Sequence, residues 1–292
     1  MTAPVLAMTG ATGFVGGATM RQAIAAGWHV RAVTRRPQPG REGVTWIAGA
    51  LDDTGSLAEM ATGSDVVMHI AGVVNVPTRA AFEAGNAWAT ANVIDAARTA
   101  GVTRFVHVSS LAAREPGLSN YGWSKERAEA AVKDSGLDWT IVRPPGVYGP
   151  WDRDYLEMFK LARRGVVPVP PPGRSSLIHV QDLAELLVAM LPGGEAVTHR
   201  TFEPDDGHAG GWSHRELARV IGWAVGRRPW VVHLPRPLLE QASRADSFVR
   251  RSRARLTRDR VGYMIHPDWV ARVQSGAYRQ WVQTQYGAPA TA

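Results

Sequence analysis

The segment SNYGWSKERAEAAV, which begins at Ser119, places a tyrosine phenol and a lysine amine four residues apart. Alanine and charged residues after Ser124 favour a helix, and residues four apart lie on one face of a helix. Tyr121 and Lys125 are therefore predicted to be neighbours. A phenol can exchange a proton with a substrate oxygen, and a nearby ammonium group lowers its ordinary pKa of about 10. On this pattern alone, a polar turn at the start of an amphipathic helix is an equally good interpretation.

A second candidate for chemistry is the glycine-rich segment MTGATGFVGGATMRQAIAAG near the start of the chain. Gly10, Gly13 and Gly16 have the spacing G-x-x-G-x-x-G and lie between a predicted strand and a predicted helix. Such a turn lets the backbone approach a pyrophosphate, which the free N–H groups and the dipole of the following helix attract. Glycines also mark plain turns, but this position favours dinucleotide binding.

The residues after the second predicted strand bear on the choice of nucleotide. NAD-specific sites usually place an acid there for the ribose 2′-hydroxyl, whereas an arginine accommodates the 2′-phosphate of NADP. This chain reads RAVTRRPQPG, with Arg35 and Arg36 and no acid. The sequence therefore favours NADP (NADPH) as cofactor over NAD, although two arginines at a strand end can also simply face solvent.

Short apolar runs alternate with helical patterns through the first two-thirds of the chain. Helical patterns cover residues 15–26, 80–100 and 121–134. Six β-branched runs bounded by Gly, Pro or polar residues are predicted strands. They begin at Val5, His29, Val44, Asp65, Arg104 and Trp139. Strands that alternate with helices predict an α/β fold whose doubly wound parallel sheet is covered on both faces.

The regular alternation of strands and helices ends after Pro144. Loops rich in Pro and Gly follow, and after them a strand and a helix that Asp182 could cap. Further along, helices dominate and tryptophan becomes frequent. We predict a nucleotide-binding sheet domain over residues 1–200, which carries the catalytic residues. A smaller, mostly helical substrate lobe is predicted over residues 201–292, with chain crossings near 145–180.

The composition bounds the partners and the compartment. The 292 residues carry a net charge of +7, no cysteine and nine histidines, which are scattered without metal-site spacing. Basic charge without a repeated basic motif fits an anionic cofactor as well as it fits nucleic acid. No run approaches the ~20 apolar residues of a membrane span, and the start lacks signal-peptide features. We expect a cytoplasmic monomer or homodimer that binds a small-molecule substrate, with no nucleic acid, no membrane and no metal.

Taken in order, these motifs resemble those of the extended short-chain dehydrogenase/reductase family. That family includes NAD(P)-dependent sugar epimerases, dehydratases and hydroxysteroid dehydrogenase-like reductases. TGATGFVG resembles its cofactor loop, GNAWATANVIDAA its N-x-x-G-T-x-N-V helix, and FVHVSS its strand ending in the catalytic serine or threonine. YGWSK, RPPGVYGP and IHVQDLA are similar to its Y-x-x-x-K, R-P-x-x-V-Y-G-P and I-H-V-x-D motifs. The resemblance covers about the first 190 residues in order, implies a Rossmann-type fold, and favours the tyrosine–lysine pair as the reaction centre.

The resemblance also implies roles for single residues. Tyr121 would exchange the proton, Lys125 would lower the pKa of that phenol and bind the nicotinamide ribose, and Ser110 would hydrogen-bond the substrate oxygen, with Ser109 as the alternative. Asn86 falls on the helix asparagine, where a proton-relay role and a purely structural role are both open. Cofactor contacts are expected from Gly10, Thr12, Gly13, Phe14, Val15, Gly16, Arg35, Arg36, Leu51, Ala71, Gly72, Pro144 and Val147, besides Tyr121 and Lys125.

Two positions depart from the family pattern. Ala89 stands where the helix motif has glycine, and Ala50 replaces the first aspartate of the G-D-L-x-D motif. The second departure removes an expected hydrogen bond to adenine.

Three functions are compatible with these features. The first is a net NADP-dependent oxidoreductase acting on a carbonyl or secondary alcohol, and the second is a nucleotide-sugar epimerase or dehydratase that uses the cofactor transiently. The third is an NADP(H)-binding protein without catalysis, which the intact Ser110, Tyr121 and Lys125 disfavour. The absence of a dehydratase acid pair after VSS favours the first.

The substrate end of the sequence gives fewer signals. Trp123, Trp151 and Trp212 suggest an apolar or aromatic substrate, or else they pack the small lobe. The arginine run over 244–260 could bind a phosphate or carboxylate group, or form a solvated helix face.

Overall fold

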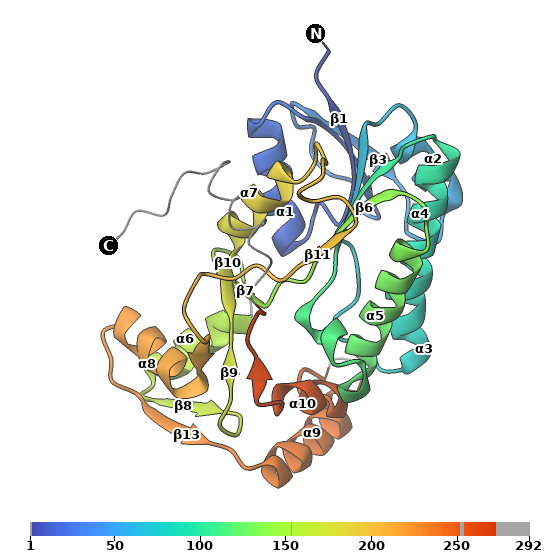
Figure 1. Ribbon diagram of the computed structural model, residues 1–292. Coiled ribbons are helices and arrows are strands. Elements are labelled where there is room, and N and C mark those ends of the chain that lie inside the picture. The colour runs from blue at the N-terminus through green and yellow to red at the C-terminus, as the bar shows by residue number, and fades with distance from the viewer. Residues whose placement is uncertain (1, 153, 252–253, 273–292) are drawn as a thin grey trace.

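A seven-stranded parallel sheet forms the centre of the molecule in the computed structural model, which describes residues 2–152, 154–251 and 254–272 (Figure 1). The strand order is β11-β6-β5-β4-β1-β2-β3. The strands are β1 (Val5–Thr9), β2 (His29–Thr34), β3 (Val44–Ala48), β4 (Val66–His69), β5 (Arg104–Val108), β6 (Asp138–Val142) and β11 (Arg200–Phe202). The order reverses between β1 and β4, and ligands of such sheets bind at this switch point, beyond the carboxyl ends of the strands.

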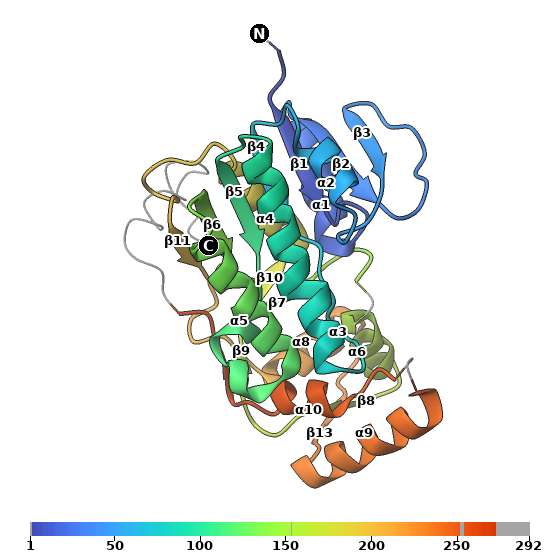
Figure 2. The ribbon, with the colours of Figure 1, turned by 90° about the vertical axis from the view of Figure 1, so that its right-hand side faces the viewer.

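Helices cover both faces of the sheet. Helices α1 (Phe14–Ala25) and α7 (Val180–Ala189) pack on one face (Figure 1), whereas α2 (Thr54–Ala61), α4 (Ala89–Thr99) and α5 (Asn120–Lys133) cover the other (Figure 2). The alternation of side chains along β1 explains the two layers: Leu6 and Met8 join the first core, and Ala7 joins the second. Strands buried on both faces need apolar residues at nearly every position, as the predicted strands have.

The predicted helix over 80–100 is observed as three consecutive pieces. They are α3 (Arg79–Phe82), the π-helical turn η1 (Glu83–Trp88) and α4 (Ala89–Thr99). A π turn inside a helix often marks a functional site, and this one contains Asn86.

The second lobe is built from two separate stretches of the chain. The first stretch contains β7 (Gly146–Tyr148), α6 (Asp154–Arg163), β8 (Val166–Val169), β9 (Arg174–Ser175) and β10 (Leu177–His179). The second contains β12 (Trp212–Ser213), α8 (His214–Ala224), β13 (Trp230–His233), α9 (Arg236–Arg250), α10 (Arg258–Met264) and β14 (Asp268–Trp269). Small sheets join the two stretches, because β8 pairs with β13, and β9 pairs with β12 and β14.

No single residue divides the two lobes, because the chain passes between them more than once. Strand β11 (Arg200–Phe202) returns to the main sheet beside β6, and the chain crosses into the small lobe within the region 145–180. The predicted cap of α7 was wrong: His179 is the N-cap, and Asp182 lies in the first turn. Within the described ranges, no helix is long and apolar enough to cross a membrane.

Candidate active site

The glycine loop closes tightly against the end of β4. Gly10 has a φ of +77°, and a Cβ atom there would lie 2.8 Å from the backbone nitrogen of Ala71. A Cβ atom on Gly16 would lie 2.0 Å from the carbonyl oxygen of Gly10. Gly13 donates its N–H to that same oxygen at 2.9 Å and precedes the first residue of α1. Only glycine fits at positions 10 and 16, so the loop brings the N-terminus of α1 close to the switch point.

The neighbours of this loop are the other residues that the sequence assigned to the cofactor. Thr12 and Gly13 are exposed, whereas Phe14 and Val15 are half-buried and pack together with Val147 in one small cluster. Pro144 is buried. Val147 thus lies beside the first residues of α1.

The end of β2 presents two unpaired cations. The side chains of Arg35 and Arg36 are exposed and make no hydrogen bond or ion pair with any residue that the structure describes. Thr34 holds the turn, because its hydroxyl donates to the carbonyl of Arg36 at 2.9 Å. Both guanidinium groups are therefore free to bind an anion beside the glycine loop. Leu51, on the next loop, is half-buried and accepts a hydrogen bond from Asn92 at its carbonyl, at 2.8 Å.

Asn86 joins the loop after β4 to the catalytic helix. Its Oδ1 accepts from the N–H of Val73 at 2.8 Å, and its Nδ2 donates to the carbonyl of Val73 at 3.0 Å and to Ser124 Oγ at 2.9 Å. A Cβ atom on Gly72 would lie 2.7 Å from Asn86 Oδ1 and 4.0 Å from Lys125 Nζ. The structural role is therefore observed directly, and the proton-relay role stays a prediction.

Tyr121, Ser110 and Lys125 come together at the carboxyl end of β5. The Ser110 hydroxyl lies near enough to the Tyr121 phenol to lower the pKa of that phenol. Lys125 is buried, 5% exposed, and its Nζ donates to the carbonyl of Val108 at 2.9 Å. The structure thus brings all three predicted catalytic groups to one place.

Burial controls the protonation of this cluster. It lowers the pKa of Lys125 to about 8, against the opposing effect of Glu129. Burial also raises the pKa of Tyr121, while the Ser110 hydroxyl lowers it. Burial of the phenol is the largest effect on its pKa here, and the lowering expected from Lys125 together with an oxidised nicotinamide stays a prediction.

Two buried histidines lie behind the cluster. The rings of His69 and His107 stack with centroids 5.4 Å apart. Burial and the charge of Lys125 lower the pKa of His69 to about 3, and burial lowers that of His107 well below its ordinary value. His69 is hydrogen-bonded to Thr9 at 2.7 Å and to Thr90 at 3.1 Å. Both rings are therefore neutral packing groups.

A buried ionic network lies beneath Ser110. Ser109 donates to Glu129 Oε1 at 2.6 Å, and Arg143 donates to the two Glu129 oxygens at 2.8 and 2.7 Å. Arg143 also pairs with Glu203 at 3.4 Å. Ser109 is thus engaged away from Tyr121, which leaves Ser110 as the hydroxyl beside the phenol. Glu129 was not among the residues predicted from the sequence, although its position four residues after Lys125 was a usable signal.

Helix α10 reaches the catalytic tyrosine from the far end of the chain. The carboxylate of Asp259 accepts hydrogen bonds from the N–H groups of Asn120 and Tyr121, the latter at 3.3 Å. The ring of Tyr263 packs against that of Tyr121, with centroids 6.1 Å apart. Asp259 therefore caps the N-terminus of α5 with a negative charge, which the helix dipole favours. No pattern in the sequence pointed to this contact.

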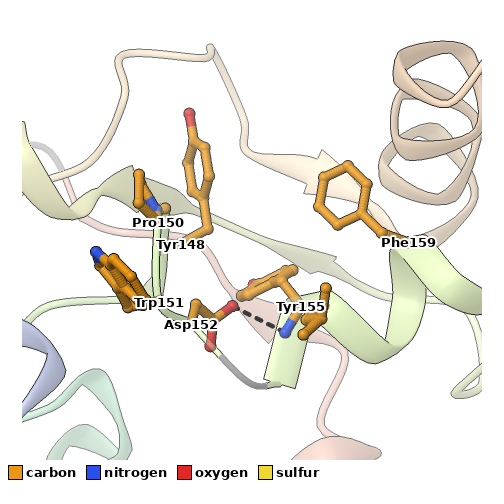
Figure 3. A pocket seen from close by; sticks show the side chains of 8 residues that line it. Tyr148, Pro150, Trp151, Asp152, Tyr155 and Phe159 are labelled. Atoms are coloured by element: carbon orange, nitrogen blue, oxygen red, sulfur yellow. Dashed lines mark hydrogen bonds between the residues drawn. The ribbon is translucent and has the colours of Figure 1, made fainter.

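A cavity of about 490 Å³ opens beside the turn after β7 (Figure 3). It is lined by Tyr148, Gly149, Pro150, Trp151, Asp152, Tyr155, Leu156 and Phe159. Of the three tryptophans that suggested an apolar substrate, only Trp151 lines this cavity. Trp123 lies under the guanidinium of Arg79 at 3.8 Å, and Trp212 donates its indole N–H to Asp206 at 2.7 Å.

The arginine run is partly neutralised by an aspartate of its own segment and by one of α6. Arg250 pairs with Asp246 at 3.2 Å, and Arg260 pairs with Asp154 at 2.9 Å. Asp246 also accepts the N–H groups of Arg255 and Leu256. Residues 252 and 253 lie outside the described residues, and so does the predicted substrate lobe beyond residue 272.

Comparison with known proteins adds family and fold. A family model described as NAD(P)H-binding matches residues 10–192. A ceramide reductase of Caulobacter vibrioides is 34% identical over an alignment that covers 97% of this chain and 90% of that protein. A UDP-glucose 4-epimerase of Vibrio cholerae is 25% identical over 78% of each chain. The solved structure of a human epimerase family protein with NADPH superposes with a TM-score of 0.72, at 21% identity, over 97% of this chain and 94% of that one.

Proposed function

The chain belongs to the NAD(P)H-binding family and, within it, to the extended short-chain dehydrogenases/reductases, and we propose that it transfers a hydride between NADP(H) and the carbonyl or secondary alcohol of a small apolar or aromatic substrate. The observation that carries this proposal is the meeting of Ser110, Tyr121 and Lys125 at the end of β5. The glycine loop lies across the switch point from this cluster.

The residues divide the chemistry among them. The bound nicotinamide supplies or accepts the hydride. Tyr121 gives its phenol proton to the carbonyl oxygen during reduction, and its raised pKa keeps that proton in place until the oxygen becomes basic. Ser110 donates a hydrogen bond to the same oxygen and fixes its position. Lys125, with a pKa of about 8, is mostly protonated at neutral pH and can bind ribose hydroxyls beside Gly72.

The preference for NADPH rests on Arg35 and Arg36. Both are exposed and free of ion pairs with the described residues, and the end of β2 carries no acid. A 2′-phosphate placed there would gain charge-assisted hydrogen bonds.

The apolar character of the substrate rests on the lining of the cavity and on relatives. The ceramide reductase supports a reductase with a lipophilic substrate. The epimerase of Vibrio cholerae supports the second candidate, a nucleotide-sugar epimerase. The two candidate functions differ in their effect on the cofactor, since only a reductase consumes NADPH in proportion to product.

The test is a screen for NADPH oxidation with ketones, aldehydes and nucleotide sugars, repeated with Tyr121→Phe. This variant keeps the ring and should reduce turnover by roughly 10²- to 10⁴-fold with NADPH binding nearly unchanged. Tyr263→Phe, which removes a hydroxyl from the neighbouring ring, is the matched control and should keep most of the activity. Near-full activity of Tyr121→Phe would refute the assignment, and an epimerised sugar without net NADPH loss would establish the second candidate.

A further inference from the structure

The cavity of Figure 3 is shaped by a strained turn. Gly149 has a φ of +145°, and Trp151, a residue type that rarely adopts this region, has a φ of +77°. Trp151 is 86% exposed and Leu156 is 46% exposed, so both stand at the open side of the cavity. Tyr155 lies deeper, and its hydroxyl reaches to 2.4 Å from the position of a Cβ atom on Gly146. One side of the cavity is therefore closed by β7 and α6, and the other side opens to solvent.

The lining offers no free charge to a ligand. Asp152 is the only ionisable carboxylate or base among the eight described lining residues, apart from two phenols. Its two oxygens accept the backbone N–H groups of Asp154 and Tyr155 at 2.9 and 2.8 Å, so it serves as the cap of α6. Burial raises the pKa of Tyr155, which keeps that phenol neutral. A phosphate or sugar–diphosphate group would lose its hydration here without a compensating cation, whereas an uncharged apolar group would lose nothing.

The chain segment that lines the cavity is tied to the catalytic groups at two places. Before the lining residues, the carbonyl of Pro144 accepts the N–H of Leu111, the residue after Ser110, at 3.1 Å. Between the lining residues Asp152 and Tyr155, Asp154 pairs with Arg260 of α10 at 2.9 Å. The residue before Arg260 is Asp259, which binds the N–H of Tyr121. These contacts hold the cavity segment to the turn after Ser110 and to the N-terminus of α5.

We propose that this cavity binds an unbranched hydrocarbon chain attached to the carbonyl that the enzyme reduces. The inference rests on the proposed function, and it names the substrate as a long-chain lipid rather than a compact ketone. The volume falls in the range of roughly 300–1,000 Å³ typical of ligand pockets lined by aromatic side chains. The exposed Trp151 at its mouth leaves a path by which a longer chain continues onto the surface.

Binding without turnover tests the proposal. The affinities of alkan-2-ones with 4 to 12 carbons (chosen to bracket the cavity) are measured by calorimetry on the chain saturated with NADP⁺, which cannot reduce them. Each methylene that enters the cavity should lower the Kd about fourfold, since a buried CH₂ contributes about 0.8 kcal/mol. Beyond the capacity of the cavity, the Kd should become independent of chain length.

Leucine variants locate the binding. Leu156→Trp fills the mouth and should remove the dependence on chain length, whereas Leu156→Ala should raise the Kd of the longer ketones only. Leu238→Trp on α9 is the matched control, because Leu238 is 47% exposed, like Leu156, and is not part of the lining. Unchanged NADP⁺ binding shows that each variant is folded.

The outcomes separate this inference from the proposed function. A chain-length dependence that disappears in Leu156→Trp and persists in Leu238→Trp supports the chain site, whether or not a reducible substrate has been found. A Kd that does not depend on chain length, or that responds equally to both tryptophan variants, overturns it. Tyr121-dependent reduction of some other carbonyl would leave the proposed function standing in that case.

Discussion

Replacing Lys125 with methionine should change how the stability of this protein depends on pH. The ammonium group is buried at 5% exposure, and burial lowers its pKa from 10.5 to about 8. An unfolded chain holds that proton up to a higher pH than the folded chain does. Between these two values the unfolded state therefore binds more protons, and the stability of the wild-type chain rises with pH.

The size of the effect follows from the two pKa values. At pH 7 the buried charge costs the folded state about 3 kcal/mol, since one pKa unit corresponds to about 1.4 kcal/mol. At pH 9.5 the folded lysine is largely neutral, and the remaining cost is about 1.4 kcal/mol. The free energy of unfolding of the wild-type chain should thus gain about 2 kcal/mol between pH 7 and 9.5, relative to Lys125→Met. The variant also loses the hydrogen bond to the Val108 carbonyl, which lowers its stability by a similar amount at both pH values.

Urea denaturation of both chains at pH 7.0 and 9.5 measures this difference. The comparison cancels the titration of tyrosines and other groups that the two chains share. The same variant should bind NADPH more weakly and turn over more slowly, because it lacks the ammonium group that we propose binds the ribose hydroxyls of the cofactor. A stability difference between the chains that stays constant from pH 7.0 to 9.5 would refute the depressed pKa.

Three further variants test other parts of the site. Replacing Arg35 and Arg36 with serine should narrow the preference for NADPH over NADH by up to a few kcal/mol, as fluorescence titration with each cofactor will show; equal affinity in the unmodified chain would contradict the assignment. Gly16→Ala should abolish cofactor binding, since its Cβ would lie 2.0 Å from the Gly10 carbonyl oxygen, and wild-type affinity would be the opposing result. Glu129→Gln should lower the free energy of unfolding by about 3 kcal/mol, because the Arg143 guanidinium group loses its negatively charged partner. A thermal denaturation midpoint that does not change would argue against a stabilising network.

The sheet and the meeting of Ser110, Tyr121 and Lys125 could be predicted from the sequence because both depend on residues that are close together in the chain. Strand positions follow from short β-branched runs, and the spacing of Tyr121 and Lys125 on one helix turn places them side by side. The glycine spacing encodes a loop whose contacts are within a few residues of each other. These features were predicted, and the sheet order and family agree with them.

Contacts between distant segments were not accessible in the same way. Asp259 binds the N–H of Tyr121 across 138 residues, and nothing near either residue marks the other as its partner. The raising of the Tyr121 pKa by burial could not be predicted either, because it depends on how deeply the phenol is buried rather than on its neighbours in sequence. The burial of a side chain and the capping of a helix by a distant segment can be known only from the folded structure.

The docking of α10 and β14 beside the catalytic serine also sets a sequence of events in time. Arg114, at the end of the turn that follows Ser110, donates to the carbonyls of Asp268 and Val270 at 2.9 and 2.8 Å. A ribosome adding roughly 5–20 residues per second needs roughly 7–28 s to travel from Tyr121 to Asp259. All seven strands of the central sheet and the glycine loop are made before Asp259, so they can assemble while the first N–H groups of α5 still lack their carboxylate. A growing chain would therefore form the glycine loop of the nucleotide site well before Asp259 caps the helix that carries Tyr121, the proposed proton donor.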